Sequence, residues 1–275
     1  MKMLKKKPTD NAVVGVVTAI LLVGVIVAVV SLVQTMYIPK IMEQREAEHM
    51  DKVAEQFTDL TAVIAGQANN PTNTMPIATS ITLGSKELPY MLSIKAFGTI
   101  EILDPERSDR SIIITNDSGS SPRPYKIGVI TYSSMNGYFL DQSYTYEAGA
   151  MIVSQSDEGN MMMIRPSFSI ENNIITFDVV NIISVGSKTI ASGYGTYPIQ
   201  TKFYRISTNE TFTNVRSITI TTPLSNAWSV FLNSALYNTQ FTSIGNTISS
   251  TSPPFTVHLR VIDINAQTGP GWIEQ

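Results

Sequence analysis

Hydrophobic residues fill one uninterrupted run near the start of the chain. Residues 12–36 are 25 positions without a charge, and Gln34 is their only strongly polar member. As a helix this run is about 37 Å long, whereas the hydrocarbon core of a bilayer is about 30 Å thick. The apolar core of a secretory signal has only about 7–15 residues. The pattern therefore predicts a transmembrane helix over residues 12–37 and argues against a discarded signal.

Downstream of Pro39 the apolar residues become periodic. They recur at helical spacing, at Met42, Met50, Val53, Ala54, Phe57, Leu60, Val63 and Ile64. This spacing predicts an amphipathic stalk helix over residues 38–66, which Gly66 ends before a linker at residues 67–75. Two partners suit its apolar stripe: the chain's own outer domain, or other copies of the chain.

From residue 76 onward, short runs of β-branched and aromatic residues alternate with polar and turn residues. Nine runs read as strands: 91–103, 111–115, 125–133, 150–155, 160–170, 174–185, 199–206, 215–222 and 255–264. The fifth and sixth runs flank "ENN" and predict a hairpin. The predicted fold class is mainly β: a long N-terminal membrane-plus-stalk helix, then an antiparallel β-sandwich-like domain over residues 76–275.

One stretch of this outer domain departs from the strand pattern. In residues 223–238, Trp228, Phe231 and Leu232 recur at helical spacing. Ser225 or Asn226 is a suitable N-cap, since both side chains can accept a hydrogen bond from the first turn. We expect one short helix on the sheet, with Trp228 as its core anchor.

Charge placement orients the apolar run. Four lysines precede it, at Lys2, Lys5, Lys6 and Lys7, whereas residues 40–60 carry three basic and six acidic side chains. The positive-inside rule then makes residues 1–11 a cytoplasmic basic leader and residues 38–275 extracellular, in a single-pass protein of the cell membrane. Tyr37 marks the outer interface, where aromatic residues are enriched.

Composition argues against several kinds of chemistry. There are no cysteines and two histidines, and the net charge is −3, so no thiolate site, histidine-rich metal site or basic nucleic-acid surface is expected. No nucleophile elbow, phosphate loop or zinc-protease motif occurs. We expect neither an enzyme nor a cofactor, and His49 to be solvated or salt-bridged.

Acidic clusters are the remaining candidates for a site. Asp104, Glu106 and Asp109 form one cluster, and Asp157 and Glu158 form another in which calcium is conceivable with Asn160. Such clusters most often lie in solvated loops, which is what we expect here.

Two further patterns suggest contacts and modification. Gly15 with Ala19, and Gly24 with Ala28, are small-xxx-small pairs that let membrane helices approach closely. Glycosylation acceptor triplets begin at Asn116 and Asn209, both in predicted turns. Because this part of the chain is predicted to be outside the cell, we expect it to be accessible for glycosylation.

The segment "TDNAVVGVV", continued by a long aliphatic helix and an amphipathic stalk, resembles the N-terminal region of archaeal type IV pilins and archaellins. The whole chain is similar to uncharacterised single-span surface proteins of methanogens, through "VVGVVTA", "MEQREAEHMD" and "TSITLGSKELPY". The pilin resemblance implies leader cleavage and subunit packing through the helix. That family has Gly or Ala before the cut, whereas "KPTDN" has neither.

Two functions follow as expectations. The first is an uncleaved, non-enzymatic anchor in the lipid bilayer, which presents a β domain for adhesion, envelope contact or ligand capture. The second is a pilin-like subunit that self-associates through its N-terminal helix into a filament or pilus-like complex.

Overall fold

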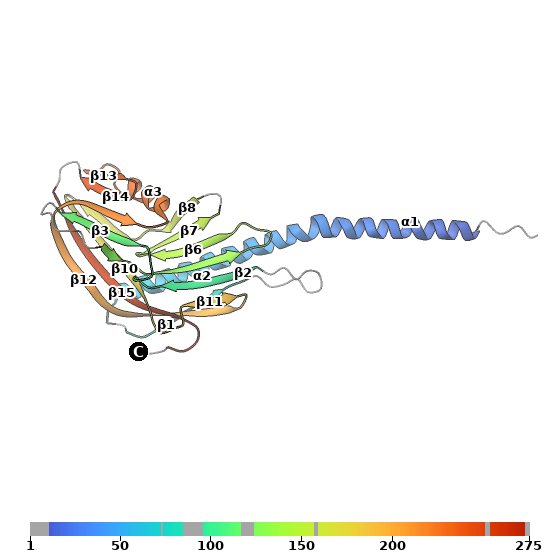
Figure 1. The fold of residues 1–275 in the computed structure, drawn as a ribbon, viewed down its shortest axis with the longest axis horizontal. Helices are drawn as coiled ribbons and strands as arrows, with labels where there is room; N and C mark the ends of the chain where they lie inside the picture. The colour runs from blue at the N-terminus through green and yellow to red at the C-terminus, as the bar shows by residue number, and fades with distance from the viewer. Residues whose placement is uncertain are drawn as a thin grey trace, which may run out of the picture.

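A computed structural model of the chain describes residues 11–72, 74–84, 96–116, 124–156, 159–250 and 254–272. Its most prominent feature is one continuous N-terminal helix in three parts: α1 (Asn11–Leu32), a π-helical turn η1 (Val33–Tyr37) and α2 (Ile38–Asn69). Figure 1 shows α1 projecting clear of a β domain that surrounds α2. This confirms the mainly β fold with a long N-terminal helix.

The helix passes Pro39 without a break. Proline cannot donate a backbone hydrogen bond, but it is tolerated in the first turn of a helix, and Pro39 lies at the start of α2. In the π turn before it, the N–H of Ile38 bonds to the carbonyl of Val33, five residues back. This turn contains one more residue than an α-helical turn, and the helix continues through it from α1 into α2.

The described residues of the β domain form two sheets. The strands are β1 (Ile77–Thr82), β2 (Phe97–Leu103), β3 (Ser111–Asn116), β4 (Pro124–Lys126), β5 (Val129–Met135), β6 (Gln142–Glu147), β7 (Ala150–Gln155), β8 (Gly159–Ile164), β9 (Ser167–Glu171), β10 (Ile174–Ser184), β11 (Ile190–Gly193), β12 (Thr196–Thr221), β13 (Phe241–Ile244), β14 (Thr247–Ser250) and β15 (Phe255–Thr268). One sheet has the order β11-β2-β5-β6-β7-β8. The other has the path β13-β14-β12-β15-β10-β9, with β1 and β3 also on β12, and β4 on β3.

Strand pairing is antiparallel as predicted, except that β10 and β15 run parallel. The predicted hairpin across "ENN" is present as β9 and β10. The predicted run 160–170 is divided at Arg165 and Pro166: its first part is β8, which pairs with β7 in the other sheet. Proline lacks the N–H that a continuing strand needs, and the chain changes sheets there.

The predicted strands 199–206 and 215–222 are one 26-residue strand, β12. "STNET", which reads as a turn, lies inside it and pairs with β15 through several register shifts. Bulges bend a strand and increase its twist, so this long strand follows the curvature of the sheet (Figure 1) instead of turning back.

The core consists of two apolar clusters between the sheets. In the first, Met50, Val53, Phe57, Leu60 and Ile64 of α2 pack with side chains from both sheets. The apolar stripe of the stalk is thus used by the chain's own β domain, the first of the two expected partners. Residues 67–69, expected in a linker, continue α2 as helix.

The second cluster lies around α3 (Ser225–Ala235), the predicted short helix. Trp228 is fully buried and packs edge-on against Phe177 and Phe231, which confirms it as the anchor. Neither Ser225 nor Asn226 is the N-cap. Leu224 occupies that position without a side-chain cap, and its own N–H donates a hydrogen bond to the Thr222 hydroxyl oxygen at 3.1 Å.

Candidate functional site

From Val14 onward, the side chains of α1 are exposed and form a mainly apolar surface. The helix is long and apolar enough to cross a membrane, and no part of its most hydrophobic 18-residue stretch is buried. At Gly15 and Gly24 an added Cβ would meet no atom within 4 Å. At 3.6 residues per turn, the pair Gly15/Ala19 faces about 180° away from the pair Gly24/Ala28. The four small residues therefore form two separate faces at different heights.

Glu46 fixes the helix to the β domain just beyond the apolar run. It occupies a position in the apolar stripe, four residues from both Met42 and Met50, and is 0% exposed. Its carboxylate accepts backbone hydrogen bonds from Gly137 at 3.1 Å, and from Tyr138 and Phe139 at 2.7 Å each. These three donors compensate the buried charge, so the β5–β6 loop is held on the helix.

His49 lies one turn further on and is buried, which corrects the expectation of a solvated or salt-bridged side chain. Its Nε2 lies 3.3 Å from the Tyr132 hydroxyl, which donates to the carbonyl of Leu83 at 2.9 Å. Burial lowers the pKa of His49, and nearby Lys52 lowers it further, whereas the Leu83 backbone and Glu46 oppose the shift. His49 is therefore a neutral member of the helix–sheet interface.

We expect the folded protein to lose stability as pH falls from 7 to 5.5. The folded pKa of His49 lies below its usual 6.5, so below pH 6.5 the unfolded chain binds the proton more tightly, and acid favours unfolding. His49→Gln should flatten this slope in urea unfolding midpoints measured across that range. His258→Gln, which alters the other histidine, is the control. An unchanged slope in His49→Gln would contradict the assignment.

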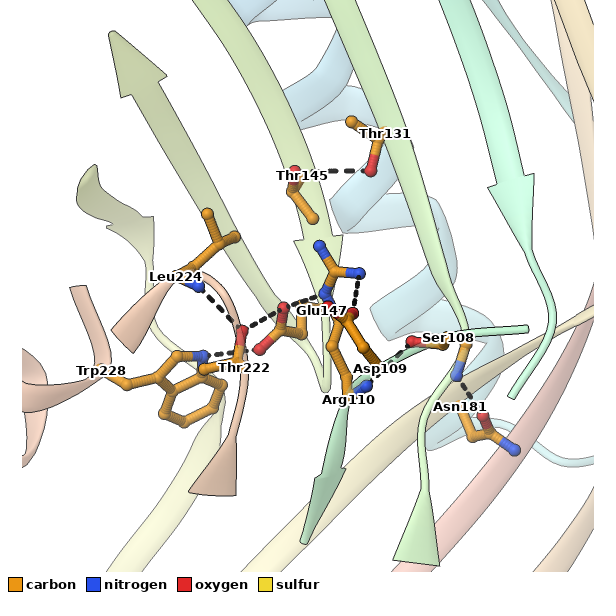
Figure 2. A network of polar contacts seen from close by, with 11 residues as sticks. Ser108, Asp109, Arg110, Thr131, Thr145, Glu147, Asn181, Thr222, Leu224 and Trp228 are labelled. Atoms are coloured by element: carbon orange, nitrogen blue, oxygen red, sulfur yellow. Dashed lines mark hydrogen bonds and ion pairs between the residues drawn. The ribbon is translucent and has the colours of Figure 1, made fainter. Parts of the chain in front are cut away.

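A buried carboxylate holds α3 against the sheets (Figure 2). Glu147, the last residue of β6, accepts hydrogen bonds from Arg110 Nε at 2.6 Å, the Thr222 hydroxyl at 2.9 Å and Trp228 Nε1 at 2.8 Å. Burial raises the pKa of Glu147, and the charge of Arg110 opposes that rise. All three donors to Glu147 are side chains of the protein itself. This network is therefore structural and connects α3 to β6.

A cavity of about 350 Å³ lies between α2 and the edge where β8 passes to β9. Small side chains of α2, among them Ala62 and Ala65, form one wall, and Ile164, Val180 and Ile262 add apolar surface. The polar part of the lining consists of Arg165, Ser167, Asp178 and Arg260. Tyr146 of β6 also lines the cavity. Sequence reasoning missed this site, because no local pattern marks residues brought together from six elements.

The predicted modification and acidic sites are dispersed. Asn209 is exposed on β12, not in a turn, and Asn116 ends β3 with its side-chain oxygen unbonded by any described residue. Asp104 bonds Ser184, Glu106 pairs with Lys126, and Asp109 pairs with Arg110. Asp157 and Glu158 lie outside the described residues. Within the described ranges, no group of three His, Cys, Asp or Glu is placed to hold a metal ion.

Comparison with known proteins gives one result. No curated protein and no solved structure matches the chain. A family model does match residues 11–267, which span the exposed helix, the embedded helix and nearly all of the β domain. The chain therefore belongs to a family of unknown function, DUF7289.

Proposed function

We propose that this protein is a single-pass membrane protein that holds a non-enzymatic β sandwich at the outer surface of the cell. The observation that carries the proposal is the division of one continuous helix. From Val14 onward the side chains of α1 are exposed and mainly apolar, whereas the apolar stripe of α2 forms part of the sandwich core. An exposed apolar helix of this length is unfavourable in water and suits a hydrocarbon layer.

The flanking charges support one orientation. Lysines precede α1 and acidic residues follow it, so the N-terminus is cytoplasmic and the β domain outside. The domain stands directly on the membrane, because buried side chains begin at Ile38, next to the last residue of the π turn. Such a placement suits adhesion, contact with the cell envelope or capture of a ligand.

The mass of the native protein tests this proposal. Full-length protein, with its lysines intact, should be recovered from membranes and should resist extraction by alkaline carbonate. Loss of about the first ten residues would contradict an uncleaved anchor, and release by carbonate would contradict a membrane span.

A pilin-like filament subunit is the second candidate. The observation that favours it is the presence of two opposite small-residue faces on α1. A simple dimer needs only one such face, whereas a helical polymer uses two different surfaces of each subunit. Under this alternative the leader is removed and α1 packs among copies of itself.

Leucine substitutions separate the two candidates. We expect Gly15→Leu with Ala19→Leu to remain in membranes at the wild-type level, because leucine favours insertion by about 0.3–0.6 kcal/mol and Gly15 has open space around it. Val16→Leu with Val27→Leu, centred about 90° away from both small-residue faces of the helix, is the matched control. Sheared cells are then examined for polymers. A wild-type polymer that only the Gly15/Ala19 variant loses would favour the filament.

A further inference from the structure

We propose that the cavity between α2 and the β8–β9 edge is a binding site for a small organic anion with an apolar body. This goes beyond the proposed function, because the site is formed by α2 together with the β domain, and the proposal holds whether α1 contacts lipid or other copies. Its volume of about 350 Å³ falls at the lower end of the roughly 300–1,000 Å³ of small-molecule sites.

The first feature is a tyrosine in the cavity lining whose hydroxyl is available to a ligand. Tyr146 is only 1% exposed and lines the cavity, yet its hydroxyl makes no hydrogen bond with any described residue. The neighbouring core tyrosines differ: Tyr132 donates to Leu83 and Tyr144 to Met50. Its oxygen is not among the fully buried polar atoms without a partner, so it keeps access to solvent. A ligand oxygen in the cavity could therefore accept a hydrogen bond from this hydroxyl in place of water.

The second feature is the charge of the cavity lining. Asp178 is fully engaged by Arg260, through Nε at 3.0 Å and Nη2 at 2.6 Å, and by Ser167 Oγ at 3.4 Å. Arg165 lines the same cavity and forms no ion pair with any residue that the structure describes. The lining therefore carries one positive charge in excess. A guanidinium recognises a carboxylate or sulfonate through charge-assisted hydrogen bonds.

The third feature is the apolar character of the cavity walls. Ala62 and Ala65 of α2 face the cavity, and small side chains at these positions leave room that larger ones would fill. Opposite them are Ile164, Val180 and Ile262. An aromatic ring or a branched aliphatic body fits such walls. The three features together specify a ligand with an apolar body, an anionic group for Arg165 and an oxygen for Tyr146.

Para-fluorobenzoate is a water-soluble probe of this chemistry. Full-length protein in lipid nanodiscs is titrated with it, and binding is followed by fluorine NMR line broadening against empty nanodiscs. We expect saturable binding that Ala65→Phe abolishes by filling the cavity. Gly66→Phe is the control, because it adds the same ring next door, where a Cβ meets nothing within 4 Å. Broadening no greater than in empty nanodiscs, or equal binding by Ala65→Phe, would overturn the proposal.

Two further variants test the polar contacts. Arg165→Gln should weaken binding about tenfold, the loss expected for one charge-assisted hydrogen bond, and neutral para-fluorobenzamide should bind wild type correspondingly less well. Tyr146→Phe should weaken binding while leaving the unfolding temperature close to the wild-type value, because it removes a hydroxyl that makes no hydrogen bond with any described residue and keeps access to solvent. If both variants bind the probe as wild type does, the cavity does not recognise an anion and the proposal fails.

Discussion

Replacing Phe57 by alanine should destabilise the β domain by about 3–5 kcal/mol, the usual result of removing a buried aromatic ring from a core. Phe57 belongs to the N-terminal helix, yet it is 0% exposed and its ring lies 6.0 Å from that of Tyr144 on β6. The loss would be a large share of the total stability of a domain, about 5–15 kcal/mol. Urea unfolding of the purified protein in detergent, followed by near-ultraviolet circular dichroism, measures it.

Leu22→Ala is the matched control for this prediction. It also removes a large apolar side chain from the same continuous helix, but Leu22 is 62% exposed on α1. The unfolding midpoint of the β domain should therefore stay at the wild-type value. Equal midpoints for Phe57→Ala and Leu22→Ala would mean that α2 is a stalk outside the core and would contradict the fold.

Replacing Glu147 by alanine should be similarly severe, at about 3–5 kcal/mol. The substitution leaves the Arg110 guanidinium, which is 11% exposed, without its buried partner, and it removes the acceptor of Trp228 Nε1. An uncompensated buried charge is more costly than the loss of an ion pair itself. Because Trp228 anchors α3, urea unfolding followed by tryptophan fluorescence should show the loss of stability as a lower unfolding midpoint.

Two comparisons make the second prediction specific. Glu106→Ala breaks the exposed pair with Lys126, whose atoms lie 2.8 Å apart, and exposed pairs contribute at most about 1 kcal/mol. The double variant Glu147→Leu with Arg110→Met removes both charges and should recover much of the lost stability. If Glu147→Ala behaves like Glu106→Ala, the network does not hold α3.

The sequence predicted the element types well where they depend on local periodicity. The apolar run, the amphipathic stripe and the short helix around Trp228 all follow from side-chain spacing. The joining of two predicted strands into β12 did not, because "STNET" has turn composition but is held extended by pairing with β15. The parallel pairing of β10 with β15 depends equally on partners distant in sequence.

The internal sites were harder to predict than the elements. Glu46 gave a usable signal, since a glutamate between Met42 and Met50 interrupts an apolar stripe, but its three backbone donors come from a loop about 90 residues away. The burial of His49 depends in the same way on Tyr132 and Leu83. For the cavity no signal existed, since Tyr146 looks like any strand tyrosine until its neighbours are known.

The continuous helix has a mechanical consequence. In many surface proteins a flexible linker separates the membrane segment from the outer domain, and such a linker stretches before any force reaches the fold. Here a pull on the sandwich acts at once along the helix axis. The packed stripe of α2 and the Glu46 carboxylate resist it in shear, so tension or tilt imposed outside the cell is transmitted to the membrane segment without slack.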